Sequence, residues 1–567
     1  MGGERRAVGA GGVAVGGHGP VRRRGARPGP PVRRRRAHPE RWLQPSLDHL
    51  HDPLAMRNME AALDRLQSAV RRKEKIRVVT DYDVDGTTSS LILQAALRSV
   101  DPNVDVSWHI PSRFDEGYGF STRAAVRAAE DGVGLIVTAD IGVRDHAAVD
   151  EARSRGVDVL VCDHHLPAGA SVPEQATVLC PPQAGDPYPN RALAACGVSL
   201  KVAQALLRSH PKSDKIVASM MKLAAIGTVA DMVSLRTLEN RAIVALGLRQ
   251  LNEGHHSPGL RALIEVCRLN GGLIDEGVVG YRLGPRINAA GRVADAGLVV
   301  ELLSTRDPDL ARELAGRIDG LNTERRDLQK RVVEEALERL GDQPDPFVVL
   351  AGDEEAGWHR GVVGIAASRI KETVNRPVAI VSVQGELAVG SVRSVPAVHA
   401  VKALESVADL LLKFGGHPAA AGFTVRAADL DALRTRLGAY VLANVDTGEL
   451  VPIHQADAVV DVARIDHALH GELQRLGPFG MGNPAPTLLV PGVRPFGVQI
   501  KGARGSLLKF LIAGAGGGRA VEAVWWDASP LAEAVQAGPV DLLASLGQNV
   551  WQGERRLQLE VVDARAA

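Results

Sequence analysis

Acidic and imidazole side chains follow three short apolar segments of the chain, at residues 75–80, 134–139 and 157–162. They are Asp81, Asp83 and Asp85 after the first segment, Asp140 after the second, and Asp163, His164 and His165 after the third. If the segments are parallel strands, their carboxyl ends meet at one edge of a sheet, where open α/β sheets bind ligands. The alternative interpretation is that the acids are turn and helix-cap residues beside a core histidine.

This set of side chains has the chemistry of a divalent metal site. Carboxylates packed together repel and raise one another's pKa values, and a divalent cation relieves that repulsion. Oxygen ligands with one or two imidazoles suit manganese or magnesium. More carboxylates than one ion requires predict a pair of ions, and two-metal sites activate water in phosphoester hydrolysis.

The elements that position these residues alternate between strand and helix. We expect strands at 75–80, 104–110, 134–139, 157–162 and 176–180, with helices beginning near Thr87, at 121–131 and from about 145. This alternation predicts an α/β fold with a doubly wound parallel sheet. Helices are expected to dominate from about 191 to 268.

One amphipathic segment, residues 307–340, predicts a single long helix. Asp307 before Pro308 is a start signal and Gly341 a stop signal. Such a helix would span about 50 Å, enough to bridge two lobes. A second α/β unit is expected from about 346 to 425. The last hundred residues are rich in strand patterns and in Gly and Pro turns, which favours a small barrel.

Composition limits the class of protein. The 567 residues are 45% hydrophobic and 23% charged, values typical of soluble multidomain proteins, and no apolar stretch is long enough to cross a membrane. Aromatic residues make up only 3%, so base stacking cannot be the whole of any nucleic-acid binding. The four cysteines, Cys162, Cys180, Cys196 and Cys267, form no C-x-x-C pair and indicate a reducing, cytosolic compartment.

The net charge of +1 conceals an asymmetry, because residues 1–42 hold eleven arginines and two acids. The remainder is therefore acidic, which excludes a globally basic nucleic-acid binder but leaves room for local basic grooves. Residues 1–41 show no apolar periodicity and are expected to be a disordered tail without an export signal. The tail could bind phosphates, or it could be a solvated extension or an over-extended start.

Four motifs in this order resemble those of the DHH phosphoesterase superfamily. They are DYDVDG (81–86), TADIGV (138–143), CDHHLP (162–167) and GTVADMV (227–233). Six more segments resemble the branch that degrades single-stranded DNA from 5′ to 3′. They are HIPSRFDEGYGF (109–120), YRLGPRINAAGR (281–292), GWHRGVVGIAASRI (357–370), GSVRS (390–394), GGHPAAAG (415–422) and LGPFGMGNPAP (476–486). The resemblance covers residues 42–565.

The resemblance implies a role for each matching residue. The metal ligands would be Asp81, Asp83, Asp85, Asp140, His164 and Asp231. His165 would face the scissile phosphate, and Asp163 would orient a ligating imidazole. Substrate would be bound by Arg113, Arg286, Asn288, His359, Ser391, Arg393, Gly415, Gly416 and His417, with Arg113, Ser391 and Arg393 forming a pocket for the 5′ end.

Some of these assignments have plainer alternatives. GGHPAAAG could be a tight turn, the arginines beside glycine could simply be exposed, and His359 could cap or pack a helix. Three positions also depart from the family pattern, which usually has Asn at Ile141, Asn-Pro at Cys180-Pro181 and Gly at Thr80. None of these changes removes a ligand, but Ile141 bears on the geometry of the site.

The implied organisation is a DHH catalytic lobe at 42–300, a bridging helix at 301–341, a second α/β, DHH-associated nucleotide-binding lobe at 342–445, and an OB-type barrel at 450–567 that binds single strands. Phe479, Phe510, Trp525, Trp526 and Trp551 could stack on bases there or belong to its core.

The implied function is a metal-dependent exonuclease that releases 5′-mononucleotides from single-stranded DNA in recombinational and mismatch repair. A monomer in the bacterial cytoplasm is expected, with no membrane association, working with a RecQ-type helicase and a single-strand-binding protein. The alternatives are a DHH phosphodiesterase acting on short oligonucleotides or cyclic dinucleotides, and a non-catalytic DHH scaffold.

Overall fold

The computed structural model describes residues 39–567 except 114–115, 168, 170, 270–271, 342–343, 503–505, 514–519 and 552–553. The expected tail therefore lies outside the described residues as far as residue 38, and its last three residues belong to a short helix, α1 (Pro39–Leu43). Among the described helices, none is both long enough and apolar enough to span a membrane.

The first sheet is parallel throughout and has the strand order β2-β1-β3-β4-β5. Its strands are β1 (Lys75–Thr80), β2 (Val106–His109), β3 (Val133–Ala139), β4 (Asp158–Cys162) and β5 (Thr177–Leu179). The strands are almost continuously apolar because helices cover both faces. The predicted doubly wound sheet is confirmed.

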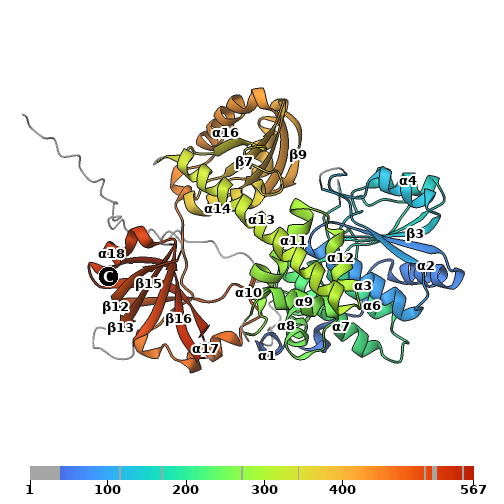
Figure 1. Cartoon of the computed structure of the whole chain (residues 1–567), viewed down its shortest axis with the longest axis horizontal. Coiled ribbons are helices and arrows are strands. Elements are labelled where there is room, and N and C mark those ends of the chain that lie inside the picture. Colours follow the sequence, from blue (N-terminus) through green and yellow to red (C-terminus); the bar gives the residue numbers. More distant parts are fainter. Residues whose placement is uncertain are drawn as a thin grey trace, which may run out of the picture. The chain divides into compact units, whose positions relative to one another are not determined.

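Helices of the two faces pack on alternate residues of these strands, as Figure 1 shows. One face carries α2 (Met59–Arg72), α3 (Val84–Val100) and α6 (Ala195–Leu206), and the other carries α4 (Thr122–Glu130) and α5 (His146–Ser154). Ile141 is 2% exposed and packs in the apolar cluster of the α4–α5 face. The unusual residue is thus a core residue of this lobe.

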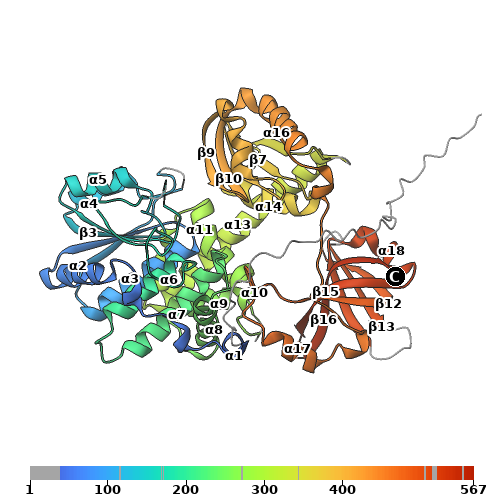
Figure 2. The same ribbon diagram turned by 180° about the vertical axis from the view of Figure 1, so that it is seen from behind.

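A helical extension follows the sheet, as expected from the sequence (Figure 2). It consists of α7 (Ser213–Ala230), α8 (Leu238–Glu253), α9 (Pro258–Val266), α10 (Glu276–Val278), a π-helical turn (Val279–Leu283), α11 (Gly284–Val293) and α12 (Gly297–Ser304). Gly247 permits close packing of α8 on α7, because a Cβ atom there would lie 2.3 Å from that of Ala225.

The predicted long helix is present as α13 (Pro308–Leu340). Asp307 caps its first turn by accepting from the backbone N–H of Asp309 at 2.8 Å. The first half of α13 packs into the helical core through residues such as Ile318, and the second half packs into the next lobe through residues such as Val332. One helix therefore belongs to two cores.

The second lobe is built on a mixed sheet of order β6-β7-β8-β10-β9, in which only β6 and β7 are parallel. Its strands are β6 (Val348–Asp353), β7 (Val378–Gln384), β8 (Leu387–Arg393), β9 (Leu411–His417) and β10 (Ala420–Arg426). Helix α14 (Val363–Val374) covers one face, and α15 (Ala400–Glu405) and α16 (Leu430–Asn444) cover the other.

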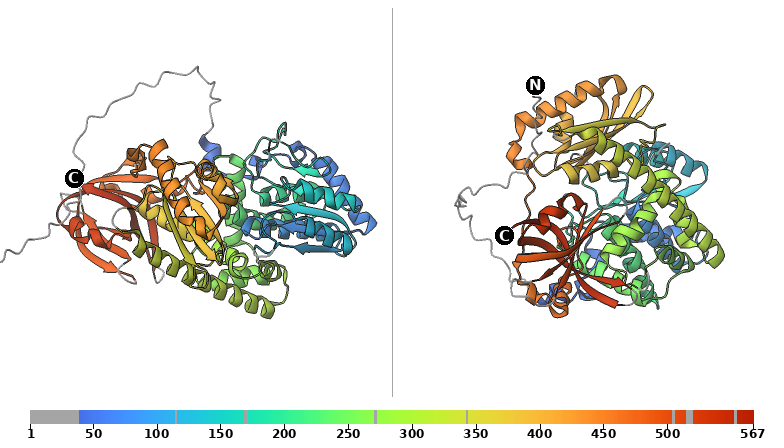
Figure 3. Two further views of the ribbon diagram at one scale, coloured as in Figure 1. Left: turned by 90° about the horizontal axis from the view of Figure 1, so that it is seen from above. Right: turned by 60° about the vertical axis from the view of Figure 1, so that its left-hand side comes forward.

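The C-terminal region contains strongly curved strands, coloured red in Figure 3. They are β11 (Ala458–Val459), β12 (Thr487–Lys501), β13 (Leu507–Ala513), β14 (Val521–Trp526), β15 (Val540–Trp551) and β16 (Glu554–Ala566), accompanied by α17 (His467–Gln474) and α18 (Ala532–Gln536). The pairings run β12-β13-β14-β16-β15 and return from β15 to β12. This ring of pairings is the arrangement expected of an OB-type domain.

The aromatic residues named as stacking candidates divide between core and surface. Phe510 is 1% exposed and belongs to the core of this region, whereas Trp526 is 62% exposed. Trp525 is half-buried against that core. Phe479 lies in the loop before β12, and the side chain of Trp551 lies outside the described residues.

Candidate metal centre

The end of β1 brings three carboxylates to the edge of the first sheet. Asp81 is 4% exposed, and its Oδ1 atom is buried without a hydrogen-bond partner. Asp83 caps α3 by accepting from the backbone N–H groups of Asp85 at 2.9 Å and Gly86 at 3.1 Å. The chain turns tightly here, since a Cβ atom on Gly86 would lie 2.4 Å from the carbonyl oxygen of Asp81.

Asp85 is completely buried and held by the first residues of α6. Its two carboxylate oxygens accept from the backbone N–H groups of Ala195 at 2.7 Å and Cys196 at 2.8 Å. The positive end of the α6 dipole stabilises the carboxylate, although burial still raises its pKa. Gly227 of α7 permits the close approach, because a Cβ atom there would lie 3.0 Å from Asp85 Oδ1.

Asp140 follows β3 in the left-handed region, with φ of 65°. Aspartate tolerates this conformation better than most residues, which suits it to a sharp turn at a strand end. Burial, then repulsion from Asp83 and Asp85, raises the pKa of Asp140 well above its ordinary value. Its Oδ1 lies 3.2 Å from Nε2 of His164.

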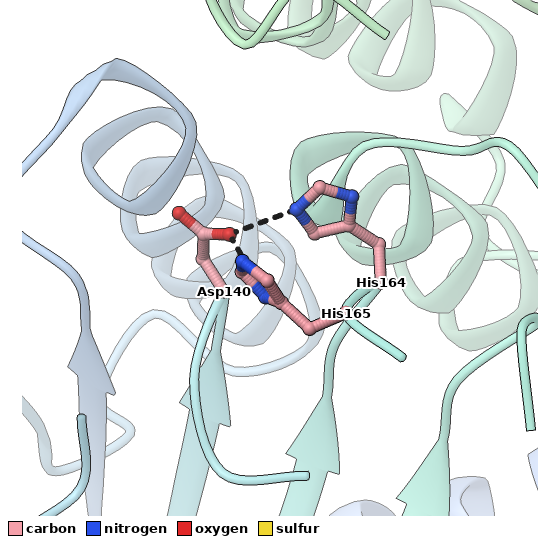
Figure 4. Close-up of side chains that lie close together, drawn as sticks. All are labelled: Asp140, His164 and His165. Carbon is pink, nitrogen blue, oxygen red and sulfur yellow. Dashed lines mark hydrogen bonds and ion pairs between the residues drawn. The ribbon is translucent and has the colours of Figure 1, made fainter. Parts of the chain in front are cut away.

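The end of β4 supplies the two imidazoles, and Figure 4 shows both beside the Asp140 carboxylate. Asp163 accepts from Nδ1 of His165 at 2.8 Å and from the backbone N–H of Val143 at 3.0 Å. Burial alone would raise the pKa of Asp163, but the bond from His165 outweighs it and lowers the pKa. The same bond outweighs burial in His165 and raises the pKa of its imidazole.

Tyr118 lies on the other side of His165. Its hydroxyl is 3.2 Å from Nε2 of His165 and 3.4 Å from the carbonyl oxygen of Asp140. The two ring nitrogens of His165 therefore have different partners, Asp163 at Nδ1 and Tyr118 at Nε2, which fix the orientation of the ring. The sequence analysis did not identify Tyr118 as a site residue.

Asp231 reaches the same place from the end of α7. Its Oδ2 lies 3.6 Å from Nε2 of His164. Burial, followed by repulsion from Asp85 and Asp83, raises its pKa to about 9. No local pattern at the end of a helix distinguishes this residue from a capping acid, and only the resemblance of GTVADMV to a known motif pointed to it.

We call the residues Asp81, Asp83, Asp85, Asp140, His164 and Asp231 the acidic cluster. Within it, the ligand atoms of Asp85, His164 and Asp231 lie within 4.8 Å of one another, and so do those of Asp81, Asp83 and Asp140. Burial lowers the pKa of His164, which keeps the imidazole neutral and able to coordinate. Carboxylates with raised pKa values, an unpartnered buried oxygen and a neutral imidazole fit manganese or magnesium.

A second group of side chains carries the opposite charge. We call Arg113, Arg292, Arg325 and Arg393 the arginine cluster. Burial, followed by repulsion from the other three arginines, lowers the pKa of Arg292 to about 9, and Asp83 opposes this shift. The arginine cluster therefore adjoins the acidic cluster.

Several donors of the arginine cluster are left without acceptors. Arg113 lies 4.1 Å over the ring of Tyr82, and its Nε atom is buried without a hydrogen-bond partner. Arg325 has a buried Nε in the same state. Arg393 donates to Oγ of Ser391 at 2.8 Å. Guanidinium groups with spare donors are suited to phosphate oxygens.

The other residues expected to bind substrate have varied surroundings. Arg286 donates to Asp319 at 2.9 Å and to the carbonyl oxygen of Val266 at 3.2 Å, so it joins α11 to α13. Asn288 is half-buried on α11. His359 accepts at Nδ1 from the backbone N–H of Gly361 at 3.1 Å.

The Gly-Gly-His segment ends β9. Gly416 has φ of 150°, and a Cβ atom there would lie 2.4 Å from the carbonyl oxygen of Ala420, so only glycine fits. Gly415 has open space beside it. Burial, followed by repulsion from Arg144 and His165, lowers the pKa of His417.

Comparison with known proteins agrees with this geometry. Three family models match the chain, "DHH family, N-terminal domain" at residues 75–228, "DHHA1 domain" at 332–443 and "RecJ OB domain" at 456–563. The chain is thus a DHH-type protein that carries an OB domain.

Individual relatives make the assignment narrower. The single-stranded-DNA-specific exonuclease RecJ of Bacillus subtilis is 36% identical, with 91% of this chain and 64% of the relative covered. The protein of the same name from Dickeya dadantii is 34% identical, with 91% of this chain and 92% of the relative covered. The chain belongs to the RecJ family.

Solved structures agree with the sequence relatives. RecJ from Thermus thermophilus in complex with Mn²⁺ has a TM-score of 0.77 and 31% identity, covering 93% of this chain and 73% of that one. A structure of the same protein in complex with Mg²⁺ has a TM-score of 0.71 and 30% identity, with 93% and 72% covered. The use of a divalent metal, expected from the sequence, is thereby confirmed.

Proposed function

We propose that this chain is a metal-dependent exonuclease that hydrolyses single-stranded DNA from the 5′ end and releases 5′-mononucleotides. The observation that carries the proposal is the adjacency of the acidic cluster, which fits divalent metal, and the arginine cluster, which fits phosphate. The names of the relatives, single-stranded-DNA-specific exonucleases, support the same substrate and reaction.

The acidic cluster would hold the metal. Bound there, divalent ions supply an activated water and stabilise the leaving oxygen of a phosphodiester. The chain's own contribution is to fix the ligands in advance, through the α6 N–H groups that hold Asp85 and the left-handed turn that presents Asp140. Asp163 accepts two backbone N–H groups, from Val143 and His164, and so fixes the turn that carries the ligating imidazole.

His165 would act on the scissile phosphate. Its bond to Asp163 favours the protonated imidazole, so Nε2 carries a hydrogen that can be donated to a phosphate oxygen. Tyr118, which contacts the same nitrogen, would give way to that oxygen or share it. The expected gain is stabilisation of the negative charge that builds up during the reaction.

The arginine cluster would recognise the 5′ end. A terminal phosphate carries more negative charge than an internal diester, and Arg113, Ser391 and Arg393 offer donors to it. Arg292 and Arg325 add charge that the sequence analysis did not assign to the site. The remaining expected contacts, from Arg286, Asn288, His359 and the Gly415–Gly416–His417 segment, stay assigned to substrate as part of this proposal.

The strand beyond the active site would be held by the C-terminal barrel, with the exposed Trp526 as a stacking surface. The cellular role proposed is strand removal in recombinational and mismatch repair in the bacterial cytoplasm. There the monomer would act with a RecQ-type helicase and a single-strand-binding protein.

The reaction is tested with two single strands of one sequence, one labelled at the 5′ end and one at the 3′ end, and with the matching duplex. With Mn²⁺, the 5′ label should appear at once as mononucleotide, while the 3′ label should pass through progressively shorter products. The duplex and samples containing EDTA should remain intact. Early release of the 3′ label as mononucleotide would reverse the proposed polarity, and equal digestion of the duplex would contradict strand selectivity.

A further inference from the structure

The segment 476–483, which we call the docking loop, has the sequence LGPFGMGN and precedes the first long barrel strand. Its motif was expected to open the C-terminal domain. In the structure, its polar contacts include several to α8, α10 and the loop between α7 and α8, all of which belong to the helical extension of the first lobe. The docking loop is therefore packed on the lobe that carries the acidic cluster.

Arg241 of α8 anchors one end of the docking loop. It is 1% exposed and lies 4.4 Å over the ring of Trp42. Its Nη2 donates to the carbonyl oxygens of Leu476 at 2.9 Å and Gly477 at 2.6 Å. A second anchor is Glu276, whose carboxylate accepts from a backbone N–H of the docking loop. Buried groups that exchange this many bonds fix the backbone they contact.

The other end of the docking loop contacts the residues that follow Asp231. The backbone N–H of Leu235 donates to the carbonyl oxygen of Met481 at 2.8 Å, and Nε of Arg236 donates to that of Gly482 at 3.1 Å. The contact is tight, since a Cβ atom on Gly482 would lie 2.9 Å from Oγ of Ser234. The turn between α7 and α8 is thus closed by the docking loop.

The opposite side of this turn is held by the first lobe itself. Asn240 donates from Nδ2 to the carbonyl oxygen of Ser234 at 2.9 Å. Met232, directly after Asp231, has φ of 56°, so the chain reverses sharply where the carboxylate is presented. A reversal of this kind depends on the contacts around it, and the docking loop supplies those at Leu235 and Arg236.

We propose that the docking loop is a positioning element of the metal centre. By fixing the turn after Asp231, it sets where that carboxylate lies and so sets the affinity for metal, separately from the grip of the barrel on DNA. The inference rests on the proposed function, in which Asp231 holds metal. It means that the C-terminal domain contributes to the chemistry of the first lobe.

The test compares two glycine substitutions in the full-length chain. Gly482→Ala strains a residue with φ of 75° and pushes against Ser234. Gly497→Ala strains a barrel residue with φ of 61° whose Cβ atom would meet nothing within 4 Å, so it is a matched control for backbone strain. The readouts are Mn²⁺ affinity by calorimetry, and kcat and KM on a short single strand.

Gly482→Ala should bind Mn²⁺ about tenfold more weakly, the scale seen when groups that support a metal ligand are lost. Its kcat should fall with KM unchanged, while Gly497→Ala keeps both values. Equal Mn²⁺ affinity in the two variants would overturn the proposal. Should Gly482→Ala fail to fold, the pair Arg241→Met and Arg241→Lys decides by the same readouts. Lysine keeps a donor for the carbonyl oxygens and should recover part of what methionine loses, and equal wild-type affinity in both overturns the proposal.

Asp231→Asn separates this inference from the proposed function. If Asp231→Asn leaves Mn²⁺ binding unchanged, the assignment of Asp231 as a ligand fails, and the role of the docking loop fails with it. If Asp231→Asn weakens binding while Gly482→Ala matches Gly497→Ala, only the positioning role of the docking loop is wrong.

Discussion

The acidic cluster and the arginine cluster are opposite in charge but alike in construction. In the first, burial and mutual repulsion raise the pKa values of Asp81, Asp140 and Asp231. In the second, the same two causes lower the pKa of Arg292. Each cluster holds like charges together at a cost in folding free energy, and a ligand of the opposite charge removes that cost. The protein is thus prepared for a cation on one side and an anion on the other.

The two clusters differ in how the chain assembles them. Most of the acidic cluster comes from strand ends of one sheet, where the fold guarantees that neighbouring strands finish together. The arginine cluster comes from a loop after β2, from α11 and α13, and from β8 in another sheet. The first cluster depends on local geometry, and the second depends on how whole elements pack.

The largest expected effect comes from breaking the acidic cluster. Asp140→Asn keeps the size and the left-handed turn but removes a charge, and hydrolysis should fall more than about a hundredfold, since even groups behind a metal ligand cost 10–100-fold. Affinity for single strands should be nearly unchanged, because the arginine cluster is intact. Single-turnover rates and filter binding measure both, with the exposed Asp150→Asn as control. A rate within tenfold of wild type would remove Asp140 from the metal centre.

Metal should stabilise the folded chain through the same cluster. Mn²⁺ at a hundred times its Kd should add about 2.7 kcal/mol per site to the free energy of unfolding. In Asp231→Asn the metal-free protein should melt at a higher temperature than wild type, because repulsion with Asp85 and Asp83 is relieved, and the gain from Mn²⁺ should shrink. Calorimetric melting with Mn²⁺ and with EDTA measures both changes. An undiminished gain from Mn²⁺ in the variant would count against Asp231.

Breaking the arginine cluster should change which end is preferred rather than whether cleavage occurs. Wild type should prefer 5′-phosphorylated over 5′-hydroxyl strands. Each charge-assisted contact is worth about 1.5–3 kcal/mol, so Arg393→Ala should reduce the preference about tenfold or more. The measurement is the ratio of kcat/KM values on the two substrates. Arg286→Ala is the control, because Arg286 pairs with Asp319. A ratio near one in wild type would place end recognition elsewhere.

The smallest effect is expected outside both clusters. Trp526→Ala should weaken binding of long strands by about 1 kcal/mol, roughly fivefold, through loss of one stacked base. Cleavage of very short oligonucleotides and the preference for a 5′ phosphate should be unaffected. Fluorescence anisotropy on strands of increasing length measures the loss. A loss of the same size on the shortest strands would show that Trp526 acts near the active site.

The sequence predicted the first sheet and its ligands well because both depend on local patterns. Continuous apolar strands, punctuated by Asp and Gly, gave the strand ends, and the sheet order placed Asp83, Asp140 and His164 together. Asp231 required the family resemblance, because an acid at the end of a helix has many ordinary explanations. The long helix was predicted almost to the residue, since its start and stop signals are strong.

What the sequence did not predict depends on packing between distant elements. Arg325 lies on a long charged helix, where an arginine usually faces solvent. Arg286 and Arg292 occur in one motif, but only the structure separates the arginine paired with Asp319 from the one in the cluster. The docking loop is short and rich in Gly and Pro, so it has no periodicity to indicate which lobe it contacts.

The left-handed conformation of Asp140 offers a way to capture the protein with its DNA. Asparagine is among the few residues that adopt φ near 65° without strain, so Asp140→Asn should leave the backbone of the site undisturbed. A chain that binds a strand normally but cuts it very slowly is a substrate trap. It could be crystallised or frozen with uncut DNA, in which the path of the strand from the 5′ end to the barrel would be visible directly.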